Sequence, residues 1–562
     1  MTGQATQQPL RAAAVNPGSA AATATTPTAP AVPASPAAIG ATAPALPQGR
    51  DRDLGAAAPY LADWEAFRRG LQGGETPETP ELPEPREMVE RPEMAEIAAL
   101  RQAAIDRFAA LGFPTTRQEE WRYTNLAPLA RAAFQRAPAR VVGGGTASSP
   151  AAVPVLGAPR LGPGAVERWS FDAAATLVFV DGQFAPELST GAAGEGPLPP
   201  GVLVASLADV LAREPRRITP WLGRHTSFQD QPFVALNTAF LNDGAVVLLP
   251  RGAVLERPIH LLYLSTPFPV APARRSRQGA GGAVRAAAPA AASAKPAVPA
   301  PATVSYPRNL IVAGEGSQLT VVETYAGEGA YFTCGVTELV AGPSAVVDHY
   351  KVQRESRDAY HLATLQVYGD RASVISSHSI SLGGGLVRND VNALLDGEGI
   401  DCILNGLYLA DGRQLVDNHM RVEHAKPHCA SHELYKGILD GKARTVFNGL
   451  IHVHPGAQKT DAKQSNRNLL LSADAIANSN PRLEIFADDV RCTHGSTVGQ
   501  LDADAVFYLR SRGIGEAAAR SLLTYAFASD IVARVKVDAV RHDLEEYLFA
   551  RLPQGEVVRQ AV

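Results

Sequence analysis

Residues 312–329, VAGEGSQLTVVETYAGEG, decide the fold of this chain. Leu319, Val321, Glu323 and Tyr325 occupy every second position, so in an extended backbone their side chains point the same way. A period of two is that of a β-strand and not of a helix. Glycines stand on both sides of the alternating run, as they do where a strand gives way to a turn. The stretch therefore predicts a short strand between two turns.

Similar stretches recur throughout residues 306–510, separated by Gly or Asp-Gly. They are LATLQVYGD (362–370), SVISSHSISLGGG (373–385), NALLDGEG (392–399), ILNGLYLADG (403–412) and FNGLIHVHPG (447–456). The last two echo each other through the tripeptide Asn-Gly-Leu. Many short strands with recurring turns and weak self-similarity predict stacked β rungs. A βαβ fold is disfavoured because helix and strand do not alternate, but periodicity alone leaves a β-helix and a large sandwich open.

Helical patterns flank this β region on both sides. Upstream, apolar residues at helical spacing predict a short amphipathic helix and then a longer one that ends at Gly112 and Pro114. The two sets are Leu61, Trp64, Phe67, Leu71 and Ile97, Leu100, Ala104, Phe108, Leu111. After Gly513 two further apolar faces predict a helical end domain. Their members are Ala519, Leu522, Leu523, Ala526, Phe527 and Val540, Leu544, Tyr547, Leu548. The residues alone leave open whether these faces pack on the β core or dock another subunit.

Composition divides the chain into five parts. We expect a disordered tail (1–58), a helical N-terminal region with a Pro/Glu-rich linker (59–136), a β-containing region (137–305), a β-helix core (306–512) and a C-terminal helical domain (513–562). The β-containing region carries low-complexity inserts at about 137–165 and 271–304. These Ala/Pro-rich segments lack the periodic apolar residues that a packed element needs.

The bulk composition excludes several classes of protein. Charged residues make up 19% and hydrophobic residues 46%, which is in the globular range, and the net charge of -4 argues against a binder of nucleic acid or anionic membranes. The N-terminal residues include no apolar run typical of a signal peptide or a membrane span, so we expect a cytoplasmic protein. The four cysteines are far apart, which argues against a disulfide framework or a self-contained zinc site.

No segment carries an energy-transducing motif. The nearest approach to a phosphate-binding loop is Gly437–Ala443, where the spacing is too short and Ala443 replaces the hydroxyl that would hold magnesium. A GxSxG nucleophile elbow is also missing. The sequence therefore predicts a chain that is not itself the ATPase of any machine to which it belongs.

Two groups of histidines are candidate metal ligands. His424, His428 and Cys429 lie close together, but Pro427 interrupts the segment, which favours surface histidines of a loop over a set of ligands. His452 and His454 share one face of a strand. For that pair the polar face of a rung is favoured over a metal site.

The densest group of reactive side chains lies in PRLEIFADDVRCTHGSTVGQ, residues 481–500. Its members are Glu484, Asp488, Asp489, Cys492 and His494. Cys492 and His494 point to the same side of an extended segment, where nearby carboxylates would orient the imidazole or tune its pKa. A thiolate beside an imidazole suits iron or an iron–sulfur fragment. On spacing alone, a buried cysteine beside a structural histidine is the commoner arrangement.

This segment resembles the SufD family of iron–sulfur cluster assembly proteins. The likeness rests on LEIFADDVRCTHGSTVGQLDADAVFYLRSRGI (483–514), on KQSNRNLLLSADAIANSNPRLEI (463–485) and on RQEEWRYTNLAPL (117–129). It extends with gaps from about residue 94 to 552 and fails over 1–58 and 271–304. The paralogous SufB family resembles the chain less, because it carries extra cysteines where this chain has residues such as Ser472, Asn478 and Ser479.

The resemblance implies a mainly β fold, a right-handed parallel β-helix with helical ends. It also implies a non-ATPase scaffold that pairs with a SufB-like paralogue and docks a SufC-like ABC ATPase through its C-terminal helices, where Leu522, Leu523 and Phe527 lie. Alone, such a chain would form a homodimer. A transient iron–sulfur cluster or iron is expected at the SufB–SufD interface, with reduced flavin in the complex and no cofactor on the isolated chain. His494 carries over as ligand or proton-handling group, and Cys492 as a weaker candidate.

Two other functions compete with this one. A β-helix carbohydrate-active enzyme would need a secretion signal and aromatic sugar platforms, yet aromatic residues are only 6% of the chain. A purely structural adaptor would need no metal-binding residue at all. Substitution of His494 by Ala separates the adaptor from a scaffold that contributes a ligand.

Overall fold

The computed structural model describes residues 52–73, 91–132, 134–137, 164–191, 198–267 and 302–562. Most of the expected tail and of both low-complexity inserts lies outside these ranges. Within them, no helix is long and apolar enough to cross a membrane.

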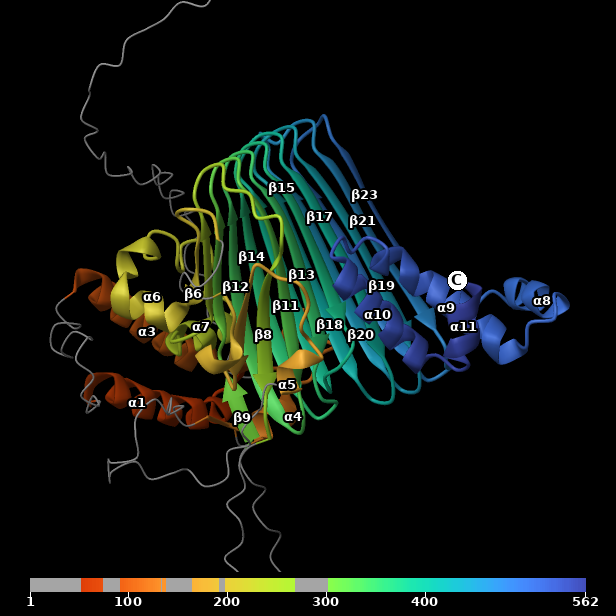
Figure 1. The fold of residues 1–562 in the computed structure, drawn as a ribbon, viewed down its shortest axis with the longest axis horizontal. Coiled ribbons are helices and arrows are strands. Elements are labelled where there is room, and N and C mark those ends of the chain that lie inside the picture. Colours follow the sequence, from red (N-terminus) through yellow and green to blue (C-terminus); the bar gives the residue numbers. More distant parts are fainter. Residues whose placement is uncertain (1–51, 74–90, 133, 138–163, 192–197, 268–301) are drawn as a thin grey trace, which may run out of the picture. The chain divides into compact units, whose positions relative to one another are not determined.

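The core is a parallel β-solenoid made of two sheets (Figure 1). Sheet 1 contains β6, β7, β10 and the even-numbered strands to β22, and sheet 2 contains β5, β4, β8, β11 and the odd-numbered strands to β23. From β10 on, consecutive strands alternate between the sheets, and each pairs in parallel with the strand two places later. The strands of this solenoid are β10 (Arg308–Ala313), β11 (Gln318–Gly327), β12 (Tyr331–Ala341), β13 (Val346–Arg354), β14 (Tyr360–Gly369), β15 (Val374–Ser381), β16 (Leu386–Leu395), β17 (Asp401–Ala410), β18 (Leu415–His424), β19 (Ala430–Leu439), β20 (Arg444–Val453), β21 (Asp461–Leu470), β22 (Ile476–Ile485) and β23 (Arg491–Gly499). The prediction of stacked rungs is confirmed, and the parallel register decides for the β-helix over the sandwich.

Rungs of similar length follow one another along this winding. Gln318, Val346 and Val374 are successive register partners, so one turn there takes 28 residues. Side chains at equivalent positions stack inside the solenoid, where Leu319, Val347 and Ile375 are buried. Each such aliphatic side chain contributes roughly 1.5–3 kcal/mol by its burial. Along each strand of the solenoid, side chains therefore alternate between two directions. We call those that face the interior the inner row and those that face outward the outer row.

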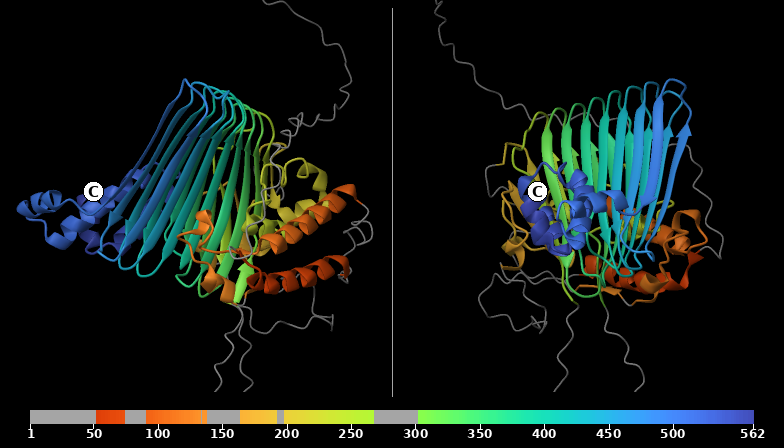
Figure 2. Two further views of the ribbon diagram at one scale, coloured as in Figure 1. Left: turned by 180° about the vertical axis from the view of Figure 1, so that it is seen from behind. Right: turned by 90° about the vertical axis from the view of Figure 1, so that its right-hand side faces the viewer.

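The first rungs are covered by other elements (Figure 2). Short antiparallel strands cap both sheets, since β5 pairs with β4 and β6 with β7. The elements at this end are β3 (Phe134–Arg136), β4 (Ala175–Val180), β5 (Gln183–Phe184), β6 (Leu203–Ser206), β7 (Ala245–Leu249), β8 (Ile259–Ser265), β9 (Ala302–Ser305), α5 (Gly164–Glu167), α6 (Leu207–Arg213) and α7 (Pro232–Ala239). No described strand continues either sheet beyond the last rung, where β22 and β23 are the outermost strands.

The N-terminal helices confirm the helical patterns in the sequence. The elements are β1 (Arg52–Asp53), α1 (Ala58–Gly73), α3 (Pro92–Leu111), β2 (Phe113–Pro114), η2 (Glu119–Trp121) and α4 (Ala127–Arg131). Helix α3 ends where Gly112 takes a φ of 63°, a conformation that favours glycine. Tyr60, Phe108 and Phe113 form an aromatic cluster with Phe233 of α7, which packs these helices against the start of the solenoid.

The C-terminal helices pack on the outer face of sheet 2. They are α8 (Ala503–Ser511), α9 (Glu516–Val532), α10 (Asp538–Arg551) and α11 (Gly555–Ala561). The buried face of α9 differs from the predicted one, since Ser521, Tyr525 and Ala528 are buried whereas Ala526 is exposed. The reason is that α9 packs both on the sheet and on the neighbouring helices, so small polar residues fill its contact face.

Candidate functional site at the open end of the solenoid

The last rung exposes two strand edges. Every residue of β23 except the partly buried Cys492 is exposed. Apolar side chains around this rung also face solvent, with exposed fractions of 43% for Ile476, 39% for Ile485, 58% for Phe486 and 49% for Val498. Unpaired N–H and C=O groups along a strand edge form a template for pairing with another chain. We call this face, made by β22, β23 and the turn between them, the open end.

Cys492 and His494 lie on the open end and point to the same side of β23, as the sequence predicts. Cys492 is the register partner of Ala462, which is fully buried inside the solenoid, so both side chains belong to the inner row. Partial burial raises the pKa of the Cys492 thiol, which disfavours the thiolate. His494 is exposed, and among the described residues no group hydrogen-bonds its imidazole.

The carboxylates near His494 in the sequence do not orient its imidazole. Glu484 Oε2 instead lies 2.9 Å from His452 Nδ1, and Asp489 pairs with Lys459. The expectation was wrong because Glu484 belongs to the outer row of β22 and Asp489 to the turn before β23. Sequence proximity at a corner of the solenoid does not bring side chains to the same face.

A buried polar pair lies beneath His494 instead. The register partner of His494 is Gln464 on β21, and the partner of Gln464 is Glu433 on β19; each of these two is 3% exposed. Gln464 Nε2 donates a hydrogen bond of 2.9 Å to Glu433 Oε2. Burial raises the pKa of Glu433 to about 7. Sequence reasoning missed this pair, although the rung length offered a signal, since Gln464 and Glu433 lie about one and two turns before His494.

The inner row also holds polar side chains on other rungs, both near the open end and far from it. Tyr408 donates a hydrogen bond of 2.8 Å to Asn468, and Asn466 donates one of 2.9 Å to the Tyr408 hydroxyl. The corresponding positions on earlier rungs include Ser381 and Gln353. Buried polar side chains cost stability unless they are hydrogen-bonded, and a solenoid core made of apolar side chains would avoid that cost.

The other candidate histidines occupy separate places. His424 is fully buried inside the solenoid, where its Nε2 lies 2.9 Å from Ser431 Oγ and burial lowers its pKa to about 4, so the prediction of a surface loop is wrong for this residue. His428 is exposed in a turn, as predicted. His452 and His454 lie on the outer face beside Glu484 and Glu423, which confirms a polar face. In the described part of the chain, no three His, Cys, Asp or Glu side chains form a metal site.

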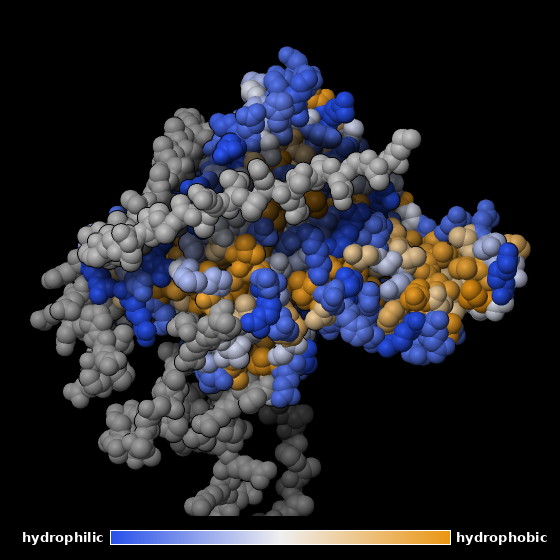
Figure 3. All heavy atoms as spheres, turned by 45° about the horizontal axis from the view of Figure 1, so that its top comes forward, coloured by the Kyte–Doolittle hydropathy of each residue, from blue (hydrophilic) through white to orange (hydrophobic). Residues whose placement is uncertain are grey.

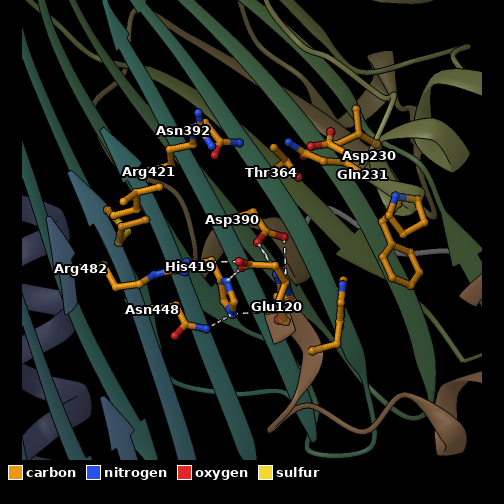
Figure 4. Close-up of a pocket in the computed structure, with 17 residues that line it drawn as sticks. Glu120, Asp230, Gln231, Thr364, Asp390, Asn392, His419, Arg421, Asn448 and Arg482 are labelled. Atoms are coloured by element: carbon orange, nitrogen blue, oxygen red, sulfur yellow. Dashed lines mark hydrogen bonds and ion pairs between the residues drawn. The ribbon is translucent and has the colours of Figure 1, made fainter. Parts of the chain in front are cut away.

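A second polar cluster binds the N-terminal region to sheet 1 (Figure 4). The Arg388 guanidinium lies 3.8 Å from the centre of the Trp121 ring, and its Nη1 donates a hydrogen bond of 2.8 Å to the Glu120 carbonyl. Thr124 donates one of 2.5 Å to Asp417 Oδ2. His419 Nδ1 lies 3.1 Å from Glu120 Oε2. We call these contacts the clasp. Of its residues, Glu120, Trp121, Arg388 and His419 line a cavity of about 230 Å³.

Opposite charges set the protonation of the clasp. Burial alone would lower the pKa of His419, but the neighbouring Asp417 carboxylate raises it to about 9. The hydrogen bond from His419 lowers the pKa of Glu120 to about 2. The imidazole is therefore a cation at neutral pH, and the clasp is an ion pair.

The predicted docking residues lie on α9. Leu522 and Phe527 pack partly against the cluster on the outer face of sheet 2, and Leu523 is half-buried. Lys436 of β19 donates a hydrogen bond of 3.1 Å to the Phe527 carbonyl and pairs with Asp530 at 2.7 Å. Larger apolar side chains are exposed on α8. Phe507 is 70% and Tyr508 57% exposed. Figure 3 shows that apolar residues gather over the C-terminal helices.

Comparison with known proteins identifies the family. The model of the SUF system FeS cluster assembly SufBD core domain matches residues 297–527, and that of the SufBD protein N-terminal region matches residues 82–141 and 171–261. Both describe the same class, the proteins of iron–sulfur cluster assembly. An iron–sulfur cluster assembly SufBD family protein of Synechocystis is 32% identical over 463 residues, which cover 80% of this chain and 90% of that relative. The chain belongs to the SufBD family.

Relatives named SufD are also similar to the chain. The iron–sulfur cluster assembly protein SufD of Escherichia coli is 28% identical over 457 residues, covering 81% of this chain and 93% of that protein. SufD of Bacillus subtilis is 24% identical over 326 residues, covering 56% of this chain and 65% of that protein. The predicted resemblance to the SufD family is confirmed.

Proposed function

We propose that this chain is a non-ATPase scaffold subunit that builds or transfers nascent iron–sulfur clusters in the cytoplasm. In this proposal its open end pairs with a SufB-like subunit, and its C-terminal helices dock a SufC-like ABC ATPase. The observation that carries the proposal is the uncovered last rung, which combines free strand edges, exposed apolar side chains and the pair Cys492–His494.

The open end suits pairing with a homologous solenoid. A partner with the same rung geometry presents strand edges of matching length and spacing, and backbone hydrogen bonds would continue both sheets. Ile485 and Val498 would leave water in such an interface, and burial of their exposed area favours association. In the absence of the paralogue, a second copy of this chain would take its place and give a homodimer.

His494 supplies chemistry that suits transient binding of iron. A neutral imidazole binds iron through one nitrogen, and an exposed side chain releases its ligand readily. Cys492 is the weaker ligand because partial burial disfavours its thiolate. One imidazole and one thiol do not hold a stable cluster, so the remaining ligands must come from the partner. The cluster or iron is cargo of the interface, and any reduced flavin belongs to the assembled complex rather than to the isolated chain.

The C-terminal helices provide a route for ATP-driven motion. Phe507, Tyr508, Leu522, Leu523 and Phe527 form the proposed docking region, of which Phe507 and Tyr508 offer the largest exposed area. The ion pairs Lys436–Asp530 and Arg354–Asp543 tie these helices to sheet 2. A nucleotide that favours one arrangement of two ATPase subunits would therefore shift the relative position of two solenoids.

Anaerobic co-purification tests the proposal. The tagged chain is expressed with SufB-like and SufC-like partners, and the mass and visible absorbance of the eluted complex are recorded. We expect a stable assembly with iron–sulfur absorbance for the natural chain. We expect an assembly of the same mass but with little absorbance for His494→Ala, and an unchanged assembly for His428→Ala, a control at an exposed histidine away from the open end. A colourless natural chain without partners contradicts the scaffold function, and full absorbance with His494→Ala supports a structural adaptor.

A further inference from the structure

The buried side chains of Glu433 and Gln464 lie in register with His494, on the two rungs that precede it. Gln464 is held at one end, because its Nε2 donates to Glu433 Oε2 at 2.9 Å. Its carbonyl oxygen, Oε1, is buried and has no hydrogen-bond partner among the described residues. A buried acceptor without a donor costs about 1–3 kcal/mol, so its persistence in this position calls for an explanation.

The surrounding backbone makes room for this arrangement. Gly449 of sheet 1 faces Gln464 across the interior, and a Cβ at this glycine would lie 2.2 Å from Gln464 Nε2. Any larger residue at 449 would displace the amide. The solenoid therefore accommodates a side chain whose oxygen it does not itself satisfy.

The missing donor is available on the next strand. His494 is the register partner of Gln464 on the same inner row, and neighbouring strands are about 4.8 Å apart, within reach of two long side chains. The imidazole of His494 is exposed and makes no hydrogen bond with any described residue. One ring N–H of this imidazole is a donor that matches the unpaired acceptor Oε1 of Gln464.

We propose that Gln464 is a positioning residue for His494: its Oε1 accepts a hydrogen bond from one ring nitrogen, and Glu433 holds the amide in that orientation. The bond fixes the imidazole tautomer, and the other nitrogen is left unprotonated and turned toward the open end. Histidines that bind metal commonly donate their second N–H in this way. The inference rests on the proposed function only for the cargo of His494, and not for the hydrogen bond itself.

Ring-nitrogen NMR of the full-length chain tests the hydrogen bond directly. The chain is labelled with ¹⁵N-histidine, and the His494 signals are assigned by their loss in His494→Gln. We expect the natural chain to show one fixed tautomer, and Gln464→Leu to show exchange between the two tautomers. Asn468→Leu is the matched control, because Asn468 lies on the same strand and is similarly buried, but its register partner on β23 is Val498 and not His494. It should leave the His494 signals unchanged.

An exchanged pair distinguishes positioning from mere packing. Glu433→Gln combined with Gln464→Glu keeps one amide, one carboxyl group and an acceptor at position 464, so it should restore the fixed tautomer. Identical His494 signals in the natural chain and Gln464→Leu overturn the proposal, whether or not the variant is less stable.

Cluster formation in the reconstituted complex gives the second readout. We expect Gln464→Leu to lower the rate of cluster formation on the order of tenfold, and the exchanged pair to recover most of it. Should His494→Ala leave cluster formation intact while Gln464→Leu still releases the tautomer, the proposed function fails and the positioning hydrogen bond stands. Should His494→Ala abolish cluster formation while Gln464→Leu changes neither the His494 signals nor the rate of cluster formation, the positioning hydrogen bond fails and the proposed function stands.

Discussion

Protonation of Glu433 makes the stability of the fold depend on pH. Its carboxyl group has a pKa of about 7 in the folded chain, above the ordinary value of 4.5, because burial disfavours the charged form. The folded chain therefore binds a proton that the unfolded chain has released between these two pH values. The stability of the fold falls as pH rises from about 4.5 to 7, and the loss persists at higher pH.

Glu433→Gln should remove this dependence. At pH 8 we expect the variant to be more stable than the natural chain by about 3 kcal/mol at most, while at pH 4.5 the two should be nearly equal. Urea unfolding at both pH values measures the difference. Glu328→Gln, a change at an exposed carboxylate, serves as the control and should have no such effect. An equal loss of stability at both pH values would instead point to damaged packing.

At the residue scale, the sequence revealed the members of the site but not their neighbours. Cys492 and His494 were found because two residues that are two apart on a strand share a side, which is a local rule. Glu433 and Gln464 were missed because their relation to His494 depends on the rung length, which is set by turns and not by the strand pattern. The orienting role given to Glu484 and Asp489 failed for the same reason, since a turn decides which row each residue joins.

At the scale of elements, the clasp fixes the segment that contains η2 to the outer face of sheet 1. Its ion pair is strongest when His419 is protonated. The pKa of His419 is about 9 in the folded chain and 6.5 ordinarily, so the folded chain holds the proton more tightly. This stabilisation is fully present below about pH 6.5 and is lost as pH rises through 9.

Hydrogen exchange in residues 117–129 measures the clasp. We expect protection of this segment, corrected for the intrinsic pH dependence of exchange, to fall between pH 7 and 9.5 in the natural chain. In His419→Asn the protection should be low throughout this range. The exposed His428 allows a control, since His428→Asn should keep the natural profile. A natural profile without pH dependence contradicts the assignment of the clasp as an ion pair.

Trp121 is the main packing contribution of the same segment. Its ring is 6% exposed and lies under the Arg388 guanidinium. Trp121→Ala should destabilise the docked N-terminal region by about 3–5 kcal/mol, because it removes a large buried side chain and uncovers a buried charge. Tyr123→Ala provides the comparison two residues away, where the ring is 44% exposed. Limited trypsin digestion should cleave near Arg122 much faster in Trp121→Ala alone.

Most elements followed from the sequence, whereas their partners did not. The alternation in residues 312–329 identified β11, and apolar spacing with a terminal glycine identified α3 and its end at Gly112. The contact between Arg388 and Glu120 joins positions 268 residues apart, and no local pattern encodes such a contact. The buried face of α9 was misjudged because a helix packed on two sides buries small polar residues such as Ser521 and Thr524, whereas Leu522 and Leu523 are half-buried.

At the scale of the whole molecule, the open end is the decisive surface. Val498→Lys should place a charge in the interface and weaken association with the partner, or with a second copy, by at least about two orders of magnitude. Light scattering after size exclusion measures this loss, and circular dichroism should remain unchanged. Val374→Lys alters a similarly exposed valine on the side of the solenoid and should leave association intact. Loss of association in both variants, or in neither, contradicts an interface at the open end.

The covered first rung has a consequence for the size of any assembly. A repeat protein with two bare ends has a valence of two, and its subunits add head to tail into a fibre of unlimited length. Here antiparallel strands and helices occupy one end, so the subunit has a valence of one along the solenoid axis. Growth by stacking must stop after a single step. The elements over the first rung thus terminate growth. The open end has strand edges like those of an amyloid fibril, but the assembly that it forms is limited to a closed pair.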